Sequence, residues 1–301
     1  MSTIFVIWMA MAGCQTQQDE PQARDPEELK QLKLEISLNK EAVDPIELVT
    51  VTARFRNISD RLVKFQENPG LRCGATIYLE DPNGKQCRPL SFEPMGTYFP
   101  VTHELEPGAF KQGSAFCSLN FLRQEAHEKR EFKVPLNGIW KVWASYELSR
   151  GKLSSNVVNI DVKEDNSIPA NVRELFGSQA WHVLALGGET KDSDCARFRE
   201  FVLSGVGASQ RDVMAYVVGI QDLNASRYKN GVSMLQAALV SRGRNVDRRY
   251  VTLSLVNCHW YLKEFDEALS QLNKMELDTR DIETKNVTEM RAKILKESGK
   301  Q

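Results

Sequence analysis

Cysteine and histidine are the side chains most able to supply nucleophilic or metal chemistry in this chain of 301 residues, which has six cysteines and four histidines. The cysteines never occur as C-x-x-C, the spacing of zinc ribbons and thioredoxin-type sites. The histidines are His103, His127, His182 and His259, and none lies at metal-ligand spacing from another. The sequence therefore predicts no metal site and no cofactor.

Cys258 and His259 are adjacent in the sequence. On a helix, neighbouring side chains diverge by roughly 100°, and Cys258 falls on the apolar stripe of its predicted helix. We therefore interpret Cys258 as a core residue. A thiol site that joins His259 to Cys195 or His182 through the fold stays open as the alternative in which the chain is an enzyme.

Motifs of several large enzyme classes are missing from the sequence. There is no G-x-S-x-G, no H-E-x-x-H, no phosphate-binding glycine loop and no calcium loop. Thirty-nine basic residues nearly balance 40 acidic ones, whereas nucleic-acid binders usually carry a clustered basic face. We therefore expect a protein that is not an enzyme and binds no nucleic acid.

The first cysteine, Cys14, directly follows an apolar N-terminal segment. An apolar run at residues 4–12 is too short to cross a bilayer but suits the apolar region of a secretory signal. It ends in Met11-Ala12-Gly13-Cys14, which resembles a bacterial lipobox. The resemblance implies a signal peptide and lipobox at residues 1–14, with lipid attached to Cys14. A cleaved signal without lipid is the alternative.

Residues 15–31 are rich in Gln, Glu, Asp and Pro and hold almost no large apolar side chain. Such a segment cannot bury enough surface to offset the entropy of ordering it, so we expect a flexible tether. The lipobox resemblance implies the bacterial cell envelope, with domains facing the periplasm or the outside. Gln15, in place of the aspartate of inner-membrane lipoproteins, favours the outer membrane.

Residues 32–163 show the two-residue hydrophobic period of β-strands. Leu32–Leu38 alternates, and a second strand ends at Asn57-Ile58-Ser59-Asp60, a cluster of turn formers. Seven or eight short strands predict a β-sandwich. Further strands are expected at 62–65, 76–80, 86–90, 138–146 and 156–162.

The opening strands and two later segments, Gly138–Val142 and Ser155–Val158, resemble immunoglobulin-like domains of bacterial extracytoplasmic proteins. Cys73, Cys87 and Cys117 fall in this domain, so at most one disulfide joins two of them. Small buried free cysteines are the simpler interpretation.

Three aromatic side chains of this domain are candidate binding residues. Trp143 shares a strand face with Lys141 and Ser145, which we expect to point outward. An exposed tryptophan can anchor a protein or stack on a sugar, and packing against a loop or the next domain is the alternative. Tyr98 and Phe99 lie between prolines in a predicted loop at 93–103. A carbohydrate-binding or proteinase-inhibitor-like module is the alternative to a protein-binding one.

Residues 168–298 change to the 3.6-residue period of helices. We expect one helix from Val172 to the glycines at 187–188, another ending near Gly205, and a third opened by Ser209 and Asp212 as a capping box. Five positions then recur 37 residues later: Tyr228, Gly231, Val232, Leu235 and Ala238 match Phe265, Ala268, Leu269, Leu272 and Met275.

Paired helices with such a period resemble tetratricopeptide repeats, which commonly bind peptides or proteins. A packing role beside the sandwich is equally open. The sequence therefore predicts a multidomain all-β plus all-α protein: an immunoglobulin-like β-sandwich followed by helical hairpin repeats. We expect a lipid-anchored envelope protein that binds or scaffolds a protein partner.

Overall fold

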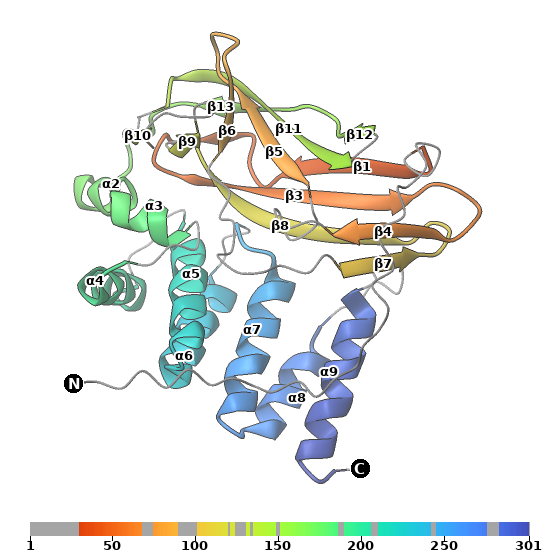
Figure 1. Cartoon of the computed structure of the whole chain (residues 1–301). Helices are drawn as coiled ribbons and strands as arrows, with labels where there is room; N and C mark the ends of the chain where they lie inside the picture. Colours follow the sequence, from red (N-terminus) through yellow and green to blue (C-terminus); the bar gives the residue numbers. More distant parts are fainter. Residues whose placement is uncertain are drawn as a thin grey trace, which may run out of the picture.

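The computed structural model describes residues 30–67, 75–89, 101–119, 121–123, 131–132, 135–148, 151–185, 190–205, 210–241, 245–275 and 283–300. Strands come first and helices follow (Figure 1). The strands are β1 (Leu32–Leu38), β2 (Ala42–Val43), β3 (Leu48–Asn57), β4 (Val63–Glu67), β5 (Thr76–Glu80), β6 (Gln86–Pro89), β7 (Val101–Leu105), β8 (Phe110–Ser118), β9 (Phe121–Arg123), β10 (Glu131–Phe132), β11 (Gly138–Leu148), β12 (Gly151–Ser154) and β13 (Val158–Val162). The helices are α2 (Ala170–Phe176), α3 (Gln179–Ala185), α4 (Asp192–Leu203), α5 (Arg211–Asn224), α6 (Tyr228–Val240), α7 (Arg248–Tyr261), α8 (Phe265–Asn273) and α9 (Glu283–Glu297).

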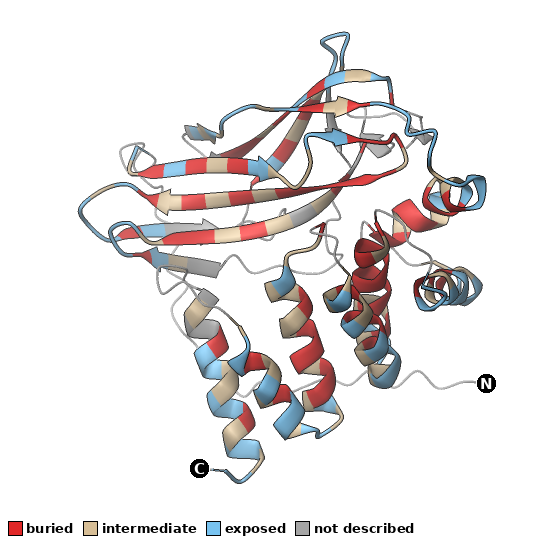
Figure 2. Cartoon of the chain, turned by 180° about the vertical axis from the view of Figure 1, so that it is seen from behind, coloured by how far each residue is buried: buried red, intermediate tan, exposed pale blue. Residues whose placement is uncertain are grey.

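Two sheets enclose the core of the β domain. One has the order β1-β3-β8 and the other the order β10-β9-β6-β5-β11-β13-β2, with β12 paired to β11. A third sheet pairs β4 with β7 and adds Val63 and Leu105 to the core. Alternate residues of both sheets point inward, so the strands in Figure 2 alternate between buried and less buried residues. Phe55 of β3 meets Tyr146 of β11 edge to face, with ring centroids 5.2 Å apart. The arrangement is β-sandwich-like.

The helices pack against their neighbours in sequence, as α5 with α6 and α7 with α8. The turns inside these two pairs share one backbone geometry. Ser226 and Lys263, 37 positions apart, have positive φ angles of 59° and 64°. The next N–H, of Arg227 and of Glu264, donates to the carbonyl five residues earlier, at 2.7 and 2.9 Å. Gly299, with φ of 71°, follows α9 in a turn of the same pattern.

A side-chain contact spans each of these turns. Asp222 accepts a hydrogen bond from Nε of Arg227 at 2.7 Å, and Nδ1 of His259 lies 2.7 Å from Oε2 of Glu264. The acidic residue therefore lies in the last turn of the first helix in one pair and just before the second helix in the other. The two turns thus share one backbone geometry, but different side chains make the contact across each turn.

Gly231 occupies the position that Ala268 holds in the later pair. A Cβ atom added at Gly231 would lie 3.0 Å from Sγ of Cys258. This close approach explains why the earlier pair has glycine, and the recurrence of the turn supports the sequence match at 37 residues. The predicted fold class, a β domain followed by a domain of paired helices, is confirmed.

The β domain and the helical domain meet in a buried interface, which we call the seam. Leu48 of β3 is fully buried in the helical core, on the face of the strand that points away from the sandwich. Gln210, which precedes α5, clasps its backbone: Oε1 accepts from the Leu48 N–H at 2.9 Å, and Nε2 donates to the Leu48 carbonyl at 2.6 Å. The side-chain amide thus satisfies backbone groups that a neighbouring strand would otherwise pair.

Three sequence-based predictions are wrong in detail. The helix expected from Val172 is broken at Gly177 into α2 and α3. The N-cap of α5 is Gln210 and not Ser209, and the carboxylate of Asp212 is buried and accepts from the backbone and side-chain amides of Asn245 at 3.0 and 2.9 Å. The predicted loop at 93–103 overlaps β7, which begins at Val101.

Candidate binding surface

The predicted binding residue Trp143 lies on the outward face of the larger sheet. Its strand β11 pairs with β5, and Trp143 is directly opposite Tyr78. The two rings are stacked with centroids 5.6 Å apart and planes within 11°. Trp143 is therefore half-buried against a neighbour. Its binding role stays a prediction.

Charged side chains surround this stack. Nζ of Lys152, from β12, lies 5.1 Å from the centroid of the Tyr78 ring, a cation–π contact. Nζ of Lys141 lies 2.7 Å from Oε1 of Glu80. Ile139, two residues before Lys141 on the same strand face, is 53% exposed. Aromatic, aliphatic and charged groups thus share one outward surface.

Ser145 lies under this surface. It follows Trp143 on the outward face of β11, yet it is fully buried and its hydroxyl has no hydrogen-bond partner in the part of the chain that the structure describes. Lys152 reaches Tyr78 from the opposite side of β11. Its aliphatic stem therefore passes over β11, the strand that carries Ser145.

A second aromatic cluster lies on the helices. The rings of Tyr228 and Tyr261 are stacked with centroids 4.9 Å apart, and Trp260 lies nearly parallel at 6.4 Å from Tyr261. Nε1 of Trp260 donates to Glu297 of α9 at 2.8 Å. This cluster was not predicted from the sequence. The repeat match that aligns Tyr228 with Phe265 was the signal that could have found it.

The other predicted site residues, Cys14, Tyr98 and Phe99, lie outside the described residues, as do Cys73 and the predicted tether up to residue 29. Cys117 and Cys195 are buried and free, as is Cys258.

The cysteines and histidines weighed for a thiol site each have another environment. Sγ of Cys195 lies 3.3 Å from Oγ1 of Thr190. Burial, and then the negative charge of Asp222, raises the pKa of Cys258 to about 11, which disfavours the nucleophilic thiolate. Nδ1 of His259 contacts Glu264. Within the described ranges, no three His, Cys, Asp or Glu side chains gather in a way that could hold a metal ion.

His182 of α3 is a buried base that predicts a pH effect on stability. Burial lowers its pKa to about 4 from the ordinary 6.5, against an opposing hydrogen bond to the backbone of Phe176. The neutral ring therefore favours the folded state above about pH 6.5, and this contribution is lost as the pH falls towards 4.

We expect His182 to make the folded protein about 2 kcal/mol less stable at pH 5 than at pH 7. Urea titrations at both pH values measure this difference. The His182→Gln variant keeps a hydrogen-bond donor without a titrating ring and should lose this part of the pH dependence. An unchanged pH dependence in the variant would contradict the assignment.

The seam holds residues that no local pattern could reveal. Asn245 joins the domains: its side-chain oxygen accepts from Nδ2 of Asn39 at 3.0 Å, and its backbone carbonyl accepts from the Thr50 hydroxyl. Asp44, also buried, accepts two hydrogen bonds from Arg173 of α2, at 3.1 and 2.9 Å, and one from the N–H of Asp165. These contacts fix the helices against the sheet.

Comparisons with known proteins complete these observations. No family model and no curated protein matches the chain. Solved structures with some likeness include a beta-glucosidase from Listeria innocua in complex with isofagomine, at 19% identity and a TM-score of 0.27. The match covers 44% of this chain and 16% of the glucosidase, so it spans a small part of that enzyme.

Two other structures match over 44% of this chain. The CARDB domain of the PF1109 protein from Pyrococcus furiosus, in complex with di-metal ions, is matched over 94% of its length at 14% identity and a TM-score of 0.24. The Pseudomonas fluorescens alkylpurine DNA glycosylase AlkC is matched over 30% at 9% identity and a TM-score of 0.26. Identities and TM-scores this low carry no information on function. None of the helices in the described part of the chain is long and apolar enough to cross a membrane.

Proposed function

We propose that this chain is a non-enzymatic, lipid-anchored protein of the bacterial cell envelope that binds a protein partner and holds it in a fixed orientation. The lipobox-like sequence that ends at Cys14 supports the anchor. The observation that carries the binding role is the outward surface formed by Trp143, Tyr78 and Ile139, which we call the aromatic face.

The composition of the aromatic face resembles that of protein interfaces. Aromatic residues are enriched where interfaces are tightest, and charged pairs commonly surround them. Trp143 and Tyr78 hold each other in place, so little side-chain freedom would be lost on binding. On the same face of β11, Lys141, which pairs with Glu80, lies between Trp143 and the exposed Ile139. An apolar centre with a charged margin favours a protein partner.

The seam supports the scaffolding part of the proposal. Gln210 clasps Leu48, and Asp44 holds Arg173, so buried hydrogen bonds tie the β domain to the helices at more than one place. Domains joined only by a flexible linker move relative to each other by default. A partner bound to the aromatic face would therefore be held at a constant angle to the helix pairs.

Site-specific photocrosslinking in cells tests this function. A photoreactive amino acid at Ile139 is expected to give a discrete crosslinked product in the membrane fraction. The Trp143→Ala change should abolish the product, because it removes the larger ring of the stack. This variant should still fold, because Trp143 is only half-buried and lies outside the buried core of the sandwich.

Two controls separate the parts of the proposal. The same probe at Val240 of α6, 82% exposed and remote from β11 in sequence, should give no such product. A Cys14→Ser change should move the protein out of the membrane fraction. A product from Ile139 that survives Trp143→Ala would refute binding at the aromatic face, and membrane retention of the Cys14 variant would refute the lipid anchor.

A further inference from the structure

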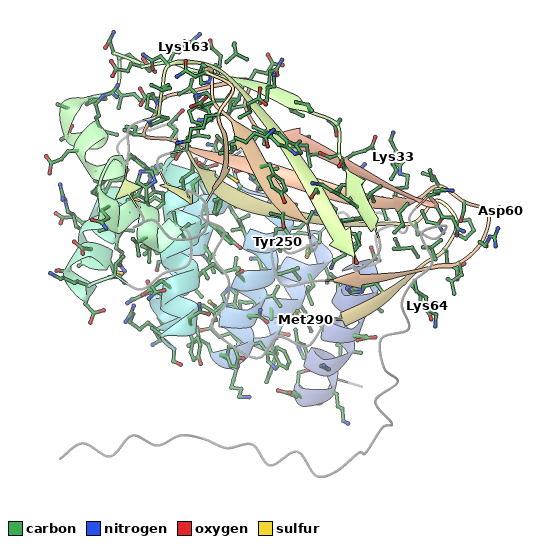
Figure 3. The ribbon with its side chains drawn as sticks, turned by 45° about the horizontal axis from the view of Figure 1, so that its top comes forward. Lys33, Asp60, Lys64, Lys163, Tyr250 and Met290 are labelled. Carbon is green, nitrogen blue, oxygen red and sulfur yellow. The ribbon has the colours of Figure 1, made fainter. Side chains whose placement is uncertain are left out.

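The outward face of the β1-β3-β8 sheet changes in character along β3. At one end Leu48 is buried among the helices. At the other end, Arg54 and Arg56 share this face with Lys33, which lies directly opposite Arg56 on β1. We call Lys33, Arg54 and Arg56 the cationic patch. In Figure 3, Lys33 and Lys163 are labelled at opposite ends of the β domain, and Lys163 marks the end from which the chain leaves for the helices.

Positive charge in the cationic patch exceeds the negative charge beside it. Glu35, opposite Arg54 on the same face, is the carboxylate that accompanies the three cations, and Lys33 contacts it at 2.7 Å. The hydrogen bond from Lys33, followed by the charges of Arg56 and Arg54, lowers the pKa of Glu35. Three cations and one carboxylate stand out on a chain whose formal net charge is −1.

The guanidinium groups of the two arginines differ in whether they have hydrogen-bond acceptors. Arg54 donates to Oε1 of Gln112 at 2.6 and 3.0 Å and lies 4.6 Å from the centroid of the Phe110 ring. Nε of Arg56 is shielded from water and has no acceptor among the residues that the structure describes. Buried donors without partners are rare in folded proteins, so Arg56 is the member of the patch that lacks an acceptor.

We propose that the cationic patch binds a carboxylate-rich segment of the partner protein. A guanidinium group holds a carboxylate through two parallel hydrogen bonds, and Lys33 adds a point charge beside it. Gln112 and the hydroxyls of Thr52 and Ser114 continue the same face, and they supply further hydrogen-bonding groups for a peptide. This inference rests on the proposed binding function but uses another face of the protein.

The small number of cations favours an acidic peptide over an anionic membrane. Membrane-binding patches typically gather about 4–8 Lys and Arg residues. The cationic patch has three cations, and Glu35 offsets part of their charge. Its hydrogen-bonding neighbours match individual carboxylate and amide groups, whereas a membrane needs only a broad positive field.

Fluorescence anisotropy with the full-length protein tests the proposal. The probe is a short fluorescein-labelled peptide of alternating glutamate and serine, with a glutamine and serine peptide for comparison. The acidic peptide should bind more tightly than the neutral one. The double variant Lys33→Gln with Arg56→Gln should weaken its binding about fivefold, as two partly exposed ion pairs would. Added salt should reduce the effect, because it screens exposed charges.

A second double variant, Lys229→Gln with Lys274→Gln, removes the same charge from exposed positions of the helical domain and should leave peptide binding unchanged. Equal weakening by both double variants, or no binding of the acidic peptide, would overturn the inference. Vesicles containing phosphatidylglycerol form the remaining arm: binding to them that needs Lys33 and Arg56, without peptide binding, also overturns it. The crosslinking from Ile139 is independent, so a failure here leaves the proposed function standing.

Discussion

The Asp222→Ala variant is expected to be less stable than the native protein by about 3 kcal/mol. Asp222 is fully buried and joins three helices: Nη2 of Arg199 on α4 lies 2.7 Å from Oδ1, and Nε of Arg227, at the start of α6, contacts the same oxygen at 2.7 Å. Removing one partner from a buried ion pair typically costs about 3–5 kcal/mol. Both arginines reach water in part, which places the effect at the lower end.

Urea denaturation followed by circular dichroism measures this loss, and Glu174→Ala provides the control. Glu174 of α2 also pairs with an arginine of α4, Arg197, at 3.0 Å, but both side chains are more than half exposed. Exposed pairs contribute about 0–1 kcal/mol, so the control should remain near native stability. If the two variants lost similar stability, burial would not be what makes the Asp222 cluster important.

Replacing Leu48 with alanine should cost about 3 kcal/mol, and the helical domain should lose protection even though the change is in a β-strand. Leu48 is fully buried in the helical core. Truncating such a residue removes apolar contacts and leaves a cavity, typically at about 2–5 kcal/mol. Gln210 still clasps the backbone at this position, because its hydrogen bonds do not involve the leucine side chain.

Hydrogen exchange distinguishes this effect from a general loss of stability. Leu48→Ala should speed the exchange of backbone amides in α5 more than in β11. Val49→Ala is the matched control, because Val49 is the next residue, equally buried, and faces the sandwich core. It should speed exchange chiefly in the sheets. A Leu48→Ala protein with unchanged exchange in α5 would show that the leucine does not couple the domains.

The periodicity of the sequence predicted much of the fold, because burying one face imposes a two-residue period on strands and a 3.6-residue period on helices. Strands β1 and β5 lie at the predicted residues. Strand β8 escaped detection because its pattern is inverted: Phe110 and Phe116 lie on the outward face, while Lys111 and Gly113 lie opposite the inward-facing residues of β3. Its outward aromatics are covered by Arg54 and by the helical domain.

Less of the candidate site than of the fold could be predicted from the sequence. Alternation along β11 correctly placed Trp143 on the outward face, but the stacking partner Tyr78 depends on the pairing of β11 with β5. The seam depends on polar residues that are far apart in the chain, such as Asn39 and Asn245. Local pattern carries no information on such pairings, since polar residues in predicted loops are ordinarily assigned to the surface.

The matching turns of the two helix pairs make the repeats alike in shape but not interchangeable. Moving the α6 unit into the place of α8 would set Arg227 beside His259, and the reverse exchange would set Glu264 beside Asp222. Two carboxylates at a buried position repel each other strongly. Each second helix therefore carries a charge that identifies its own first helix. The backbone of the turn would accept either exchange, but the one that sets Glu264 beside Asp222 would be opposed by charge repulsion.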